Sequence, residues 1–302
     1  MKKILSLVLL LFIFSPGFAQ SVDKNLTAKL QELVKGFNGD AGIFVKNLKT
    51  GKTASINADT LFPTASMIKV PIMCGVFNEI EKGNLNYNQE LIYRDSLFYA
   101  GEDIIGSFKD GEKIRLSKVQ MLSITTSDNT GSLWLQKLAG SEHINSWLDS
   151  MGFEHTRINS RTPGRRPNWE VYGWGQTTPR EMARLLTLIR EGKAISPAAS
   201  ERMYRNLIRI YYDGQALSQI PPYVQVASKS GAVDEARSEV VLVNAPHGDY
   251  VFCIATKNQK DISWNQRNEG YSLITNLSAL LWNYFEPNSD WKPAAGVEKY
   301  AE

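Results

Sequence analysis

Strand-forming patterns lie near both ends of this chain, and a long helical stretch separates them. Two short strands are predicted around Ile43 and Val45, which alternate with polar neighbours. Three more strand patterns follow late in the chain, at 223–227, 239–243 and 250–256. Short connections between them favour antiparallel neighbours. We therefore expect an α+β fold whose antiparallel sheet takes strands from both ends.

Helical spacing accounts for most of the remaining sequence. Apolar residues recur every three or four positions at the start and again near the end, at Leu26, Leu30, Leu33, Phe37, Ile274, Leu277 and Leu281. The middle of the chain shows the same spacing over 66–82, 117–126, 130–138, 178–192 and 196–208. The expected architecture is a sheet flanked by N- and C-terminal helices, with an inserted all-helical lobe.

This pattern also predicts the division of one catalytic domain into two lobes. The sheet lobe would comprise 20–65 and 213–302, and the helical lobe 66–212. A cleft between lobes is where a site is expected. The 302 residues are 43% hydrophobic, and 34 basic against 31 acidic side chains give a charge of +3. This balance gives no reason to expect a nucleic-acid partner.

The first nineteen residues are typical of a secretory signal. Lys2 and Lys3 precede an apolar run over 4–14, and small residues follow at Gly17 and Ala19. We expect cleavage near Ala19 and an exported protein, either periplasmic or secreted, without a stable membrane anchor. An uncleaved anchor is the alternative. Cleavage would leave 283 residues with a formal charge of +1, since 32 basic and 31 acidic side chains remain.

The two cysteines and three histidines do not suggest a metal site. Cys74 and Cys253 each lie in an apolar run, so we expect two buried thiols, with a disulfide as the alternative. The histidines are scattered without ligand spacing. We expect no metal, no cofactor and a monomer.

A candidate nucleophile occurs where the second helix is predicted to begin. Ser66 and Lys69 are three residues apart, so on a helix they share one face. Apolar neighbours would desolvate Lys69, and a desolvated lysine has a lowered pKa and can take a proton from a hydroxyl. Ser21 and Lys24 show the same spacing at the expected mature N-terminus, which we interpret as accidental.

Two further polar motifs follow in sequence. Ser127-Asp128-Asn129 lies between two helical segments, where it could relay a proton and bind a substrate amide, or simply cap the next helix. Lys229-Ser230-Gly231 follows a predicted strand. Its lysine and hydroxyl would bind a substrate carboxylate, and its glycine would let a substrate backbone approach. Lys49-Thr50-Gly51 is interpreted as a hairpin turn.

These three motifs, in this order, form the set shared by class A β-lactamases and penicillin-binding proteins. The chain resembles the class A β-lactamase family along nearly all of its expected mature length. The first hairpin at 41–52, Phe62-Pro63 before the nucleophile, and 177–185 after the Ω-loop are all similar to that family.

The resemblance implies a β-lactamase/transpeptidase-like fold and an acyl-enzyme mechanism. Ser66 would attack a β-lactam or acyl-D-Ala carbonyl, with Lys69 assisting proton removal. The other implied roles are an oxyanion hole formed by the backbone amides of Ser66 and Ala232, proton transfer by Ser127, amide binding by Asn129, and carboxylate binding by Lys229, Ser230 and Arg237. Tyr99 is a candidate wall of the cleft.

The chain departs from the family in the Ω-loop. Family spacing places the glutamate that activates the deacylating water near Arg161 or Thr162, and neither residue is a carboxylate base. The only acid between residues 159 and 178 is Glu170, which would be either a relocated base or a surface partner of Arg165 or Arg166. Without a positioned base, deacylation would lose the ~10²–10⁴-fold that general-base catalysis gives.

The sequence therefore favours a serine hydrolase that opens β-lactam amides and deacylates slowly. Two alternatives remain open on the same fold. One is a D-Ala-D-Ala peptidase, amidase or esterase, and the other is a non-hydrolytic penicillin-binding or sensor protein.

Overall fold

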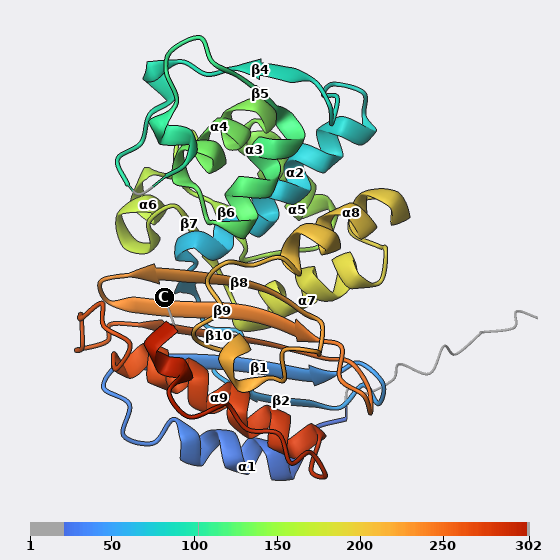
Figure 1. The fold of residues 1–302 in the computed structure, drawn as a ribbon, viewed down its shortest axis with the longest axis vertical. Helices are drawn as coiled ribbons and strands as arrows, with labels where there is room; N and C mark the ends of the chain where they lie inside the picture. Colours follow the sequence, from blue (N-terminus) through green and yellow to red (C-terminus); the bar gives the residue numbers. More distant parts are fainter. Residues whose placement is uncertain (1–20, 102, 301–302) are drawn as a thin grey trace, which may run out of the picture.

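The computed structural model describes residues 21–101 and 103–300 (Figure 1). Residues 1–19, the predicted secretory signal, lie outside this range. Within it, no helix is both long enough and apolar enough to span a bilayer.

The centre of the molecule is a five-stranded antiparallel sheet in the order β2-β1-β10-β9-β8. Its strands are β1 (Asp40–Asn47), β2 (Thr53–Ile56), β8 (Val226–Val233), β9 (Ala236–Val243) and β10 (Tyr250–Lys257). The first strand pairs with the last, with Ile43 opposite Ile254. This arrangement confirms the prediction of one antiparallel sheet built from both ends of the chain.

Two helices cover one face of the sheet, as predicted (Figure 1). They are α1 (Lys24–Leu33) and α9 (Glu269–Phe285). Leu26 and Leu30 of α1 and Leu277 and Leu281 of α9 are buried in one apolar cluster with Ile43 and other residues of the sheet. Asp23 caps α1, because its carboxylate accepts the amide of Leu26 at 3.0 Å.

The opposite face of the sheet is covered by α7 (Pro179–Arg190), which packs on β1, β9 and β10. Thr178 caps this helix, and its first residue is a proline, whose missing N–H costs nothing there. The sequence placed this segment in the helical lobe. In the structure α7 lies between that lobe and the sheet.

The helical lobe lies above the sheet in Figure 1. Its helices are α2 (Lys69–Glu81), α3 (Leu116–Thr125), α4 (Asn129–Ala139), α5 (Ser141–Ser150), α6 (Arg166–Tyr172) and α8 (Pro197–Leu207). Short strands accompany them, namely β4 (Glu90–Ile92), β5 (Lys113–Arg115), β6 (Arg157–Ile158) and β7 (Gly175–Thr177), with β3 (Phe62–Pro63) pairing with β7.

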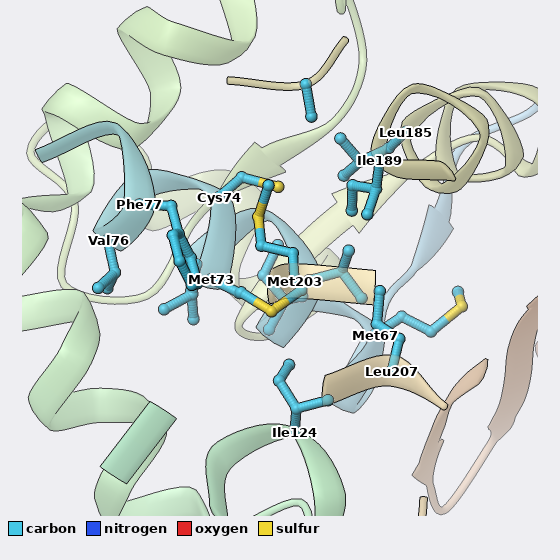
Figure 2. Packing of buried hydrophobic residues seen from close by; sticks show 14 of the residues in the cluster. Met67, Met73, Cys74, Val76, Phe77, Ile124, Leu185, Ile189, Met203 and Leu207 are labelled. Carbon is cyan, nitrogen blue, oxygen red and sulfur yellow. The ribbon is translucent and has the colours of Figure 1, made fainter. Parts of the chain in front are cut away.

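One apolar core runs from this lobe down to the sheet. Helix α2 is buried on nearly every side from Lys69 to Phe77, as expected for a helix in the middle of a core. Figure 2 shows Met73 and Cys74 of α2 packed near Met203 of α8. Cys253 of β10 belongs to the same cluster. Both cysteines are buried free thiols, which confirms the prediction of unbridged cysteines.

Candidate active site

Ser66 lies in a tight turn directly before α2. This turn is the 3₁₀ helix η1 (Ala65–Ile68), so α2 begins at Lys69 and not at Ser66 as the spacing predicted. The correction leaves Ser66 and Lys69 on one face, because a 3₁₀ helix has three residues per turn. Ala65 has a left-handed backbone, with φ of 44°, an uncommon conformation for alanine that is often held in place at functional sites.

Lys69 is completely buried, and its amine has three acceptors. The amine donates to the Ser127 carbonyl, to Ser127 Oγ at 2.9 Å and to Asn129 Oδ1 at 2.7 Å. Burial, reinforced by the nearby charge of Lys229, lowers the pKa of Lys69 well below its ordinary value. The amine is thus held between the nucleophile's segment and the Ser-Asp-Asn motif, where burial makes its neutral form more accessible than that of an exposed lysine.

The Ser-Asp-Asn motif both caps a helix and presents polar side chains to the site, which are the two roles considered for it. Asp128 caps α4, since its Oδ1 accepts the Gly131 amide at 2.7 Å. Its other oxygen accepts the amide of Ile105 at 2.9 Å. Ser127, with φ of 57°, turns the chain so that its hydroxyl and the side chain of Asn129 both reach Lys69. The cap therefore fixes the two residues on either side of Asp128.

Lys229 lies inside β8 and not beyond its end. Its side chain is buried, and its amine donates to the Ser230 carbonyl at 2.9 Å. Burial lowers the pKa of Lys229 to about 8, and the carboxylate of Glu239 opposes that shift. Glu239 is also buried, and its pKa is raised to about 7 by that burial. Ser228 Oγ donates to it at 2.6 Å.

A cavity of about 480 Å³ opens over Ser66. It is lined by Pro63, Ala65, Ser66, Tyr99, Asn129, Val171, Tyr172, Gly173, Trp174, Ala232, Val233, Glu235, Ala236, Lys257 and Asn258. Four of the predicted site residues thus line one cavity, namely Ser66, Asn129, Tyr99 and Ala232. Lys69 and Ser127 join them through the hydrogen bonds described above.

Gly231 is required by packing against the nucleophile's segment. A Cβ at this position would lie 2.5 Å from the Thr64 carbonyl oxygen and 2.8 Å from the Ser66 amide nitrogen. Real Cβ atoms do not come that close to backbone atoms. In the structure, therefore, the close approach at Gly231 is made by the Ser66 segment, where the sequence suggested a substrate backbone.

Arg237 does not reach the cavity. It is fully buried, and its guanidinium donates to the carbonyls of Val233, Ala236 (3.0 Å) and Ser263 (2.7 Å). The side chain also lies 4.6 Å from the ring centroids of Trp264 and Tyr271. Arg237 thus ties the β8–β9 turn to the loop before α9, whereas the sequence had placed it at a substrate carboxylate.

Glu170 also lies away from the cavity. It is on α6, where its carboxylate accepts from Arg166 Nε at 2.7 Å, and both side chains are more than half exposed. This is the surface pairing that the sequence offered as the alternative to catalysis. Arg165 instead donates to Asn159 Oδ1, at the start of the loop, and to Gln176 Oε1 on β7.

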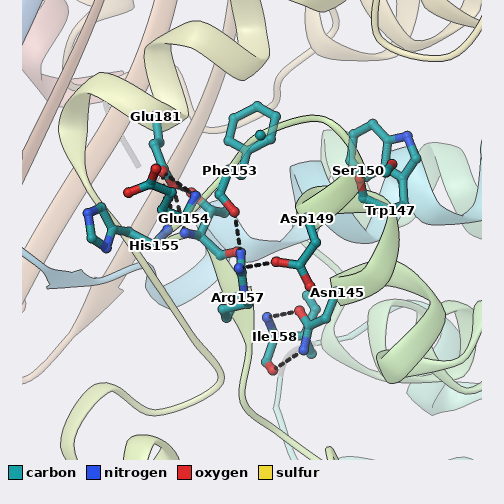
Figure 3. Close-up of polar contacts among 12 residues, drawn as sticks. Asn145, Trp147, Asp149, Ser150, Phe153, Glu154, His155, Arg157, Ile158 and Glu181 are labelled. Atoms are coloured by element: carbon teal, nitrogen blue, oxygen red, sulfur yellow. Dashed lines mark hydrogen bonds and ion pairs between the residues drawn. The ribbon is translucent and has the colours of Figure 1, made fainter.

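The base of this loop is held by a carboxylate on α7. Glu181 accepts the backbone amides of Glu154, His155 and Thr156 at distances from 2.7 to 3.2 Å (Figure 3). Asn145 of α5 adds a reciprocal pair to Ile158, accepting its amide at 2.8 Å and donating to its carbonyl at 3.0 Å. The two ends of the segment that follows, 159–174, are fixed by these contacts and by β7.

Sequence reasoning did not assign Trp174 to the site. Its indole lies 6.0 Å from Lys69 Nζ and packs edge-on against Tyr99, with ring centroids 5.1 Å apart. Nothing in the sequence separated it from Trp169, a tryptophan of the same loop that lies outside the cavity.

Lys257 was missed as well, because it occurs at the end of an ordinary strand. No group of three potential metal ligands occurs among the described residues.

Comparison with known protein sequences gives one consistent result. The sequence model of the beta-lactamase enzyme family matches residues 25–285. Beta-lactamase VEB-1 from Pseudomonas aeruginosa is 26% identical over 297 residues, which cover 94% of this chain and 98% of that protein. Beta-lactamase AER-1 from Aeromonas hydrophila is 22% identical and covers 78% of each chain.

Solved structures show the same fold. A mutant of PBP-A in an acyl-enzyme complex with penicillin G has a TM-score of 0.78 and 26% identity, covering 89% of this chain and 98% of that one. The β-lactamase from Sphaerobacter thermophilus has a TM-score of 0.77 and 21% identity, covering 88% and 98%. At that identity the second likeness concerns the fold alone.

Proposed function

The chain belongs to the beta-lactamase enzyme family, a family of hydrolases, and from this membership we propose that it opens β-lactam amides through an acyl-enzyme on Ser66. The observation that carries the proposal is the buried amine of Lys69. It lies one turn from Ser66 and within 2.9 Å of Ser127 Oγ, with its pKa lowered. A neutral amine in this position can accept the proton of the attacking hydroxyl.

The remaining groups complete one acylation step. Ser66 Oγ attacks the amide carbonyl while Lys69 takes its proton. The backbone amides of Ser66 and Ala232, both on the cavity wall, would stabilise the oxyanion. Ser127 then passes the proton from Lys69 to the leaving nitrogen, so the C–N bond breaks and the Ser66 ester remains.

Charge near the cavity suits an anionic substrate. Lys257 lines the cavity, whereas Lys229 and Ser230 of β8 lie outside its lining, with Lys229 buried. A substrate carboxylate would bind the side chains of Lys229 and Ser230, as the Lys-Ser-Gly motif implies. Asn129 lines the cavity and would orient the substrate amide. The only carboxylate among the described residues of the cavity wall belongs to Glu235, which is exposed.

Deacylation is proposed to be slow, because no residue of the loop 159–174 brings a carboxylate to the ester. This same observation favours a second candidate, a penicillin-binding protein that keeps its acyl group. The likeness to the mutant of PBP-A that was solved as an acyl-enzyme with penicillin G, at 26% identity, supports that candidate too. The two functions differ only in the fate of the ester.

One experiment separates these functions. Protein lacking residues 1–19 is mixed with a chromogenic cephalosporin, and colour and intact mass are followed together. Repeated turnover with a transient adduct on Ser66 supports the β-lactamase, and an adduct that persists for hours supports the penicillin-binding protein. Neither signal, combined with D-Ala release from an acyl-D-Ala-D-Ala peptide, supports a peptidase. If Ser66→Ala retains the activity, the mechanism is wrong.

We also propose that the protein is exported after cleavage near Ala19. The support is the sequence of residues 1–19. N-terminal sequencing of protein recovered from the periplasm or medium of an expressing cell tests this, and a mature chain that still begins at Met1 would exclude it.

A further inference from the structure

We infer that Trp174 keeps water away from Lys69 and from the ester formed on Ser66, and so sets the lifetime of the acyl-enzyme. The inference rests on the proposed function, because it needs an acyl group on Ser66. It assigns a specific role to one residue of a loop that lacks a catalytic carboxylate.

The backbone of Trp174 is fixed independently of its side chain. Its carbonyl accepts the amides of Asn159 at 2.8 Å and Ser160 at 3.1 Å. Gly173, with φ of 64°, turns the chain directly before it, between α6 and β7. The side chain can therefore be changed without removing the hydrogen bonds that hold this end of the loop.

The indole lines the cavity beside the catalytic amine, which is itself fully buried. Its centroid is 6.0 Å from Lys69 Nζ, and Tyr99 packs against it edge-on. Trp174 and Tyr99 both line the cavity with Ser66. All three hydrogen-bond acceptors of the amine come from Ser127 and Asn129. The indole supplies no further acceptor to the amine.

Hydrolysis of the ester on Ser66 would need a water molecule beside the amine of Lys69. The water oxygen attacks the acyl carbonyl while Lys69, in the neutral form that donates to only two of its three acceptors, takes one of the water protons. The bond from the carbonyl carbon to Ser66 Oγ then breaks, and that oxygen takes the proton from Lys69. A bound water needs two to four polar partners, and the face of an indole is a poor one. Trp174 thus disfavours a water beside Lys69.

The same loop provides a matched control. Trp169 is on α6, is 40% exposed, and stacks with Arg166 at 4.8 Å from guanidinium carbon to ring centroid. It does not line the cavity. Loss of Trp169 removes a tryptophan from this loop without opening a path to Lys69.

The experiment measures how long the acyl group stays on Ser66. Each protein is acylated with benzylpenicillin, excess drug is removed by rapid desalting, and the adduct is followed by intact mass. Trp174→Ala should shorten the half-life at least about tenfold, since admitted water would gain part of the ~10²–10⁴-fold of general-base catalysis by Lys69. Trp174→Phe, which keeps an apolar ring, and Trp169→Ala should stay within about twofold of the parent.

Each remaining outcome decides the question. An unchanged half-life in Trp174→Ala, or an equal shortening in Trp169→Ala, overturns the inference and leaves the proposed function intact. Rapid hydrolysis of the adduct in the parent protein also overturns the inference about Trp174 and leaves the proposed function intact. If no protein forms an adduct on Ser66, the proposed function itself is overturned, and the inference that rests on it is overturned with it. If Trp174→Ala does not fold, as judged by circular dichroism, Trp174→Leu replaces it, and an unchanged half-life there overturns the inference.

Discussion

One Cα hydrogen of Gly231 points at the backbone of the nucleophile, and a Cβ in its place would lie 2.8 Å from the Ser66 nitrogen. Strand β8 and the turn before α2 are thus in direct backbone contact. The position of Ser66 relative to the Lys-Ser-Gly motif depends on a side chain being absent.

Gly231→Ala should slow acylation by about 100-fold, because a displacement of about 1 Å at a reacting group has that effect. Stopped-flow measurement of nitrocefin acylation checks the rate. Gly36→Ala is the control: it lies at φ of 86° with open space around it, so it costs stability without touching the site. Equal acylation rates in both variants would contradict the packing argument.

Acylation by an anionic β-lactam should decline as the pH rises through about 8. The pKa of Lys229 is about 8, so its positive charge is present below that pH and lost above it. The pH profile of the acylation rate constant, measured at low substrate concentration, reports this free-enzyme value. A neutral activated ester without a carboxylate should show no such decline. A decline for both substrates would point to another group.

Glu239→Gln should move this alkaline limb to lower pH. The carboxylate of Glu239 raises the pKa of Lys229 and so opposes the lowering caused by burial. Removing that charge should therefore lower the pKa of Lys229 further. The same pH profile, recorded on Glu239→Gln and on the control Glu235→Gln, tests the effect. Glu235 is an exposed carboxylate of the cavity wall. Equal shifts in both variants would show a general effect of negative charge.

Glu239 should also make the fold less stable as the pH rises from 4.5 to 7. Its pKa is about 7 in the folded protein against 4.5 ordinarily, so the folded chain holds more protons at this site within that window. The contribution of Glu239 to the free energy of unfolding is fully present below pH 4.5, and it is lost above about pH 7. Urea unfolding at several pH values should show a smaller decline in Glu239→Gln. An identical decline would exclude Glu239 as the cause.

Glu170→Gln should leave the lifetime of the acyl-enzyme unchanged, because Glu170 pairs with Arg166 on the surface. The change in the free energy of unfolding should stay within about 0.5 kcal/mol, as for other exposed pairs. Intact-mass decay and urea unfolding measure the two quantities. A lifetime lengthened tenfold would establish Glu170 as a base on a loop that moves.

Arg237→Ala should lower the free energy of unfolding by about 2–4 kcal/mol, since it removes the hydrogen bonds to the carbonyls of Ala236 and Ser263 and the packing of a fully buried side chain. Arg205→Ala, which removes an exposed pair with Glu201, is the control. Urea unfolding gives both values. Unchanged stability combined with lost preference for anionic substrates would restore the carboxylate-binding role predicted from the sequence.

The site motifs could be predicted because each is local. Ser66 and Lys69 share a turn, and Ser127 and Asn129 flank a helix cap, so short-range spacing contains most of their geometry. The sheet was predictable for a similar reason, because each of its strands shows either an alternation of apolar and polar residues or a continuous apolar run. The strand at Lys229 was predicted too short, because a buried lysine and two small residues interrupt the apolar pattern of β8.

Other features depend on packing between distant segments. Arg237 has the residue type of a carboxylate ligand, but Trp264 and Tyr271 enclose it and carbonyls take its donors. Helix α6 buries none of its residues, so it has no apolar periodicity to detect. Trp174 and Trp169 differ only in which of them faces Lys69, and that depends on the path of the whole loop.

Pairing of the first strand with the last has a consequence for biosynthesis. Residues 40–47 are made early, but their neighbour in the sheet, residues 250–257, is made some 200 residues later. A growing chain that already contains Ser66, Lys69, Ser127 and Lys229 still lacks the strand that joins β1 to β9. Reactivity toward a β-lactam should therefore appear only on near-complete chains, and binding of a fluorescent penicillin would report completed folding.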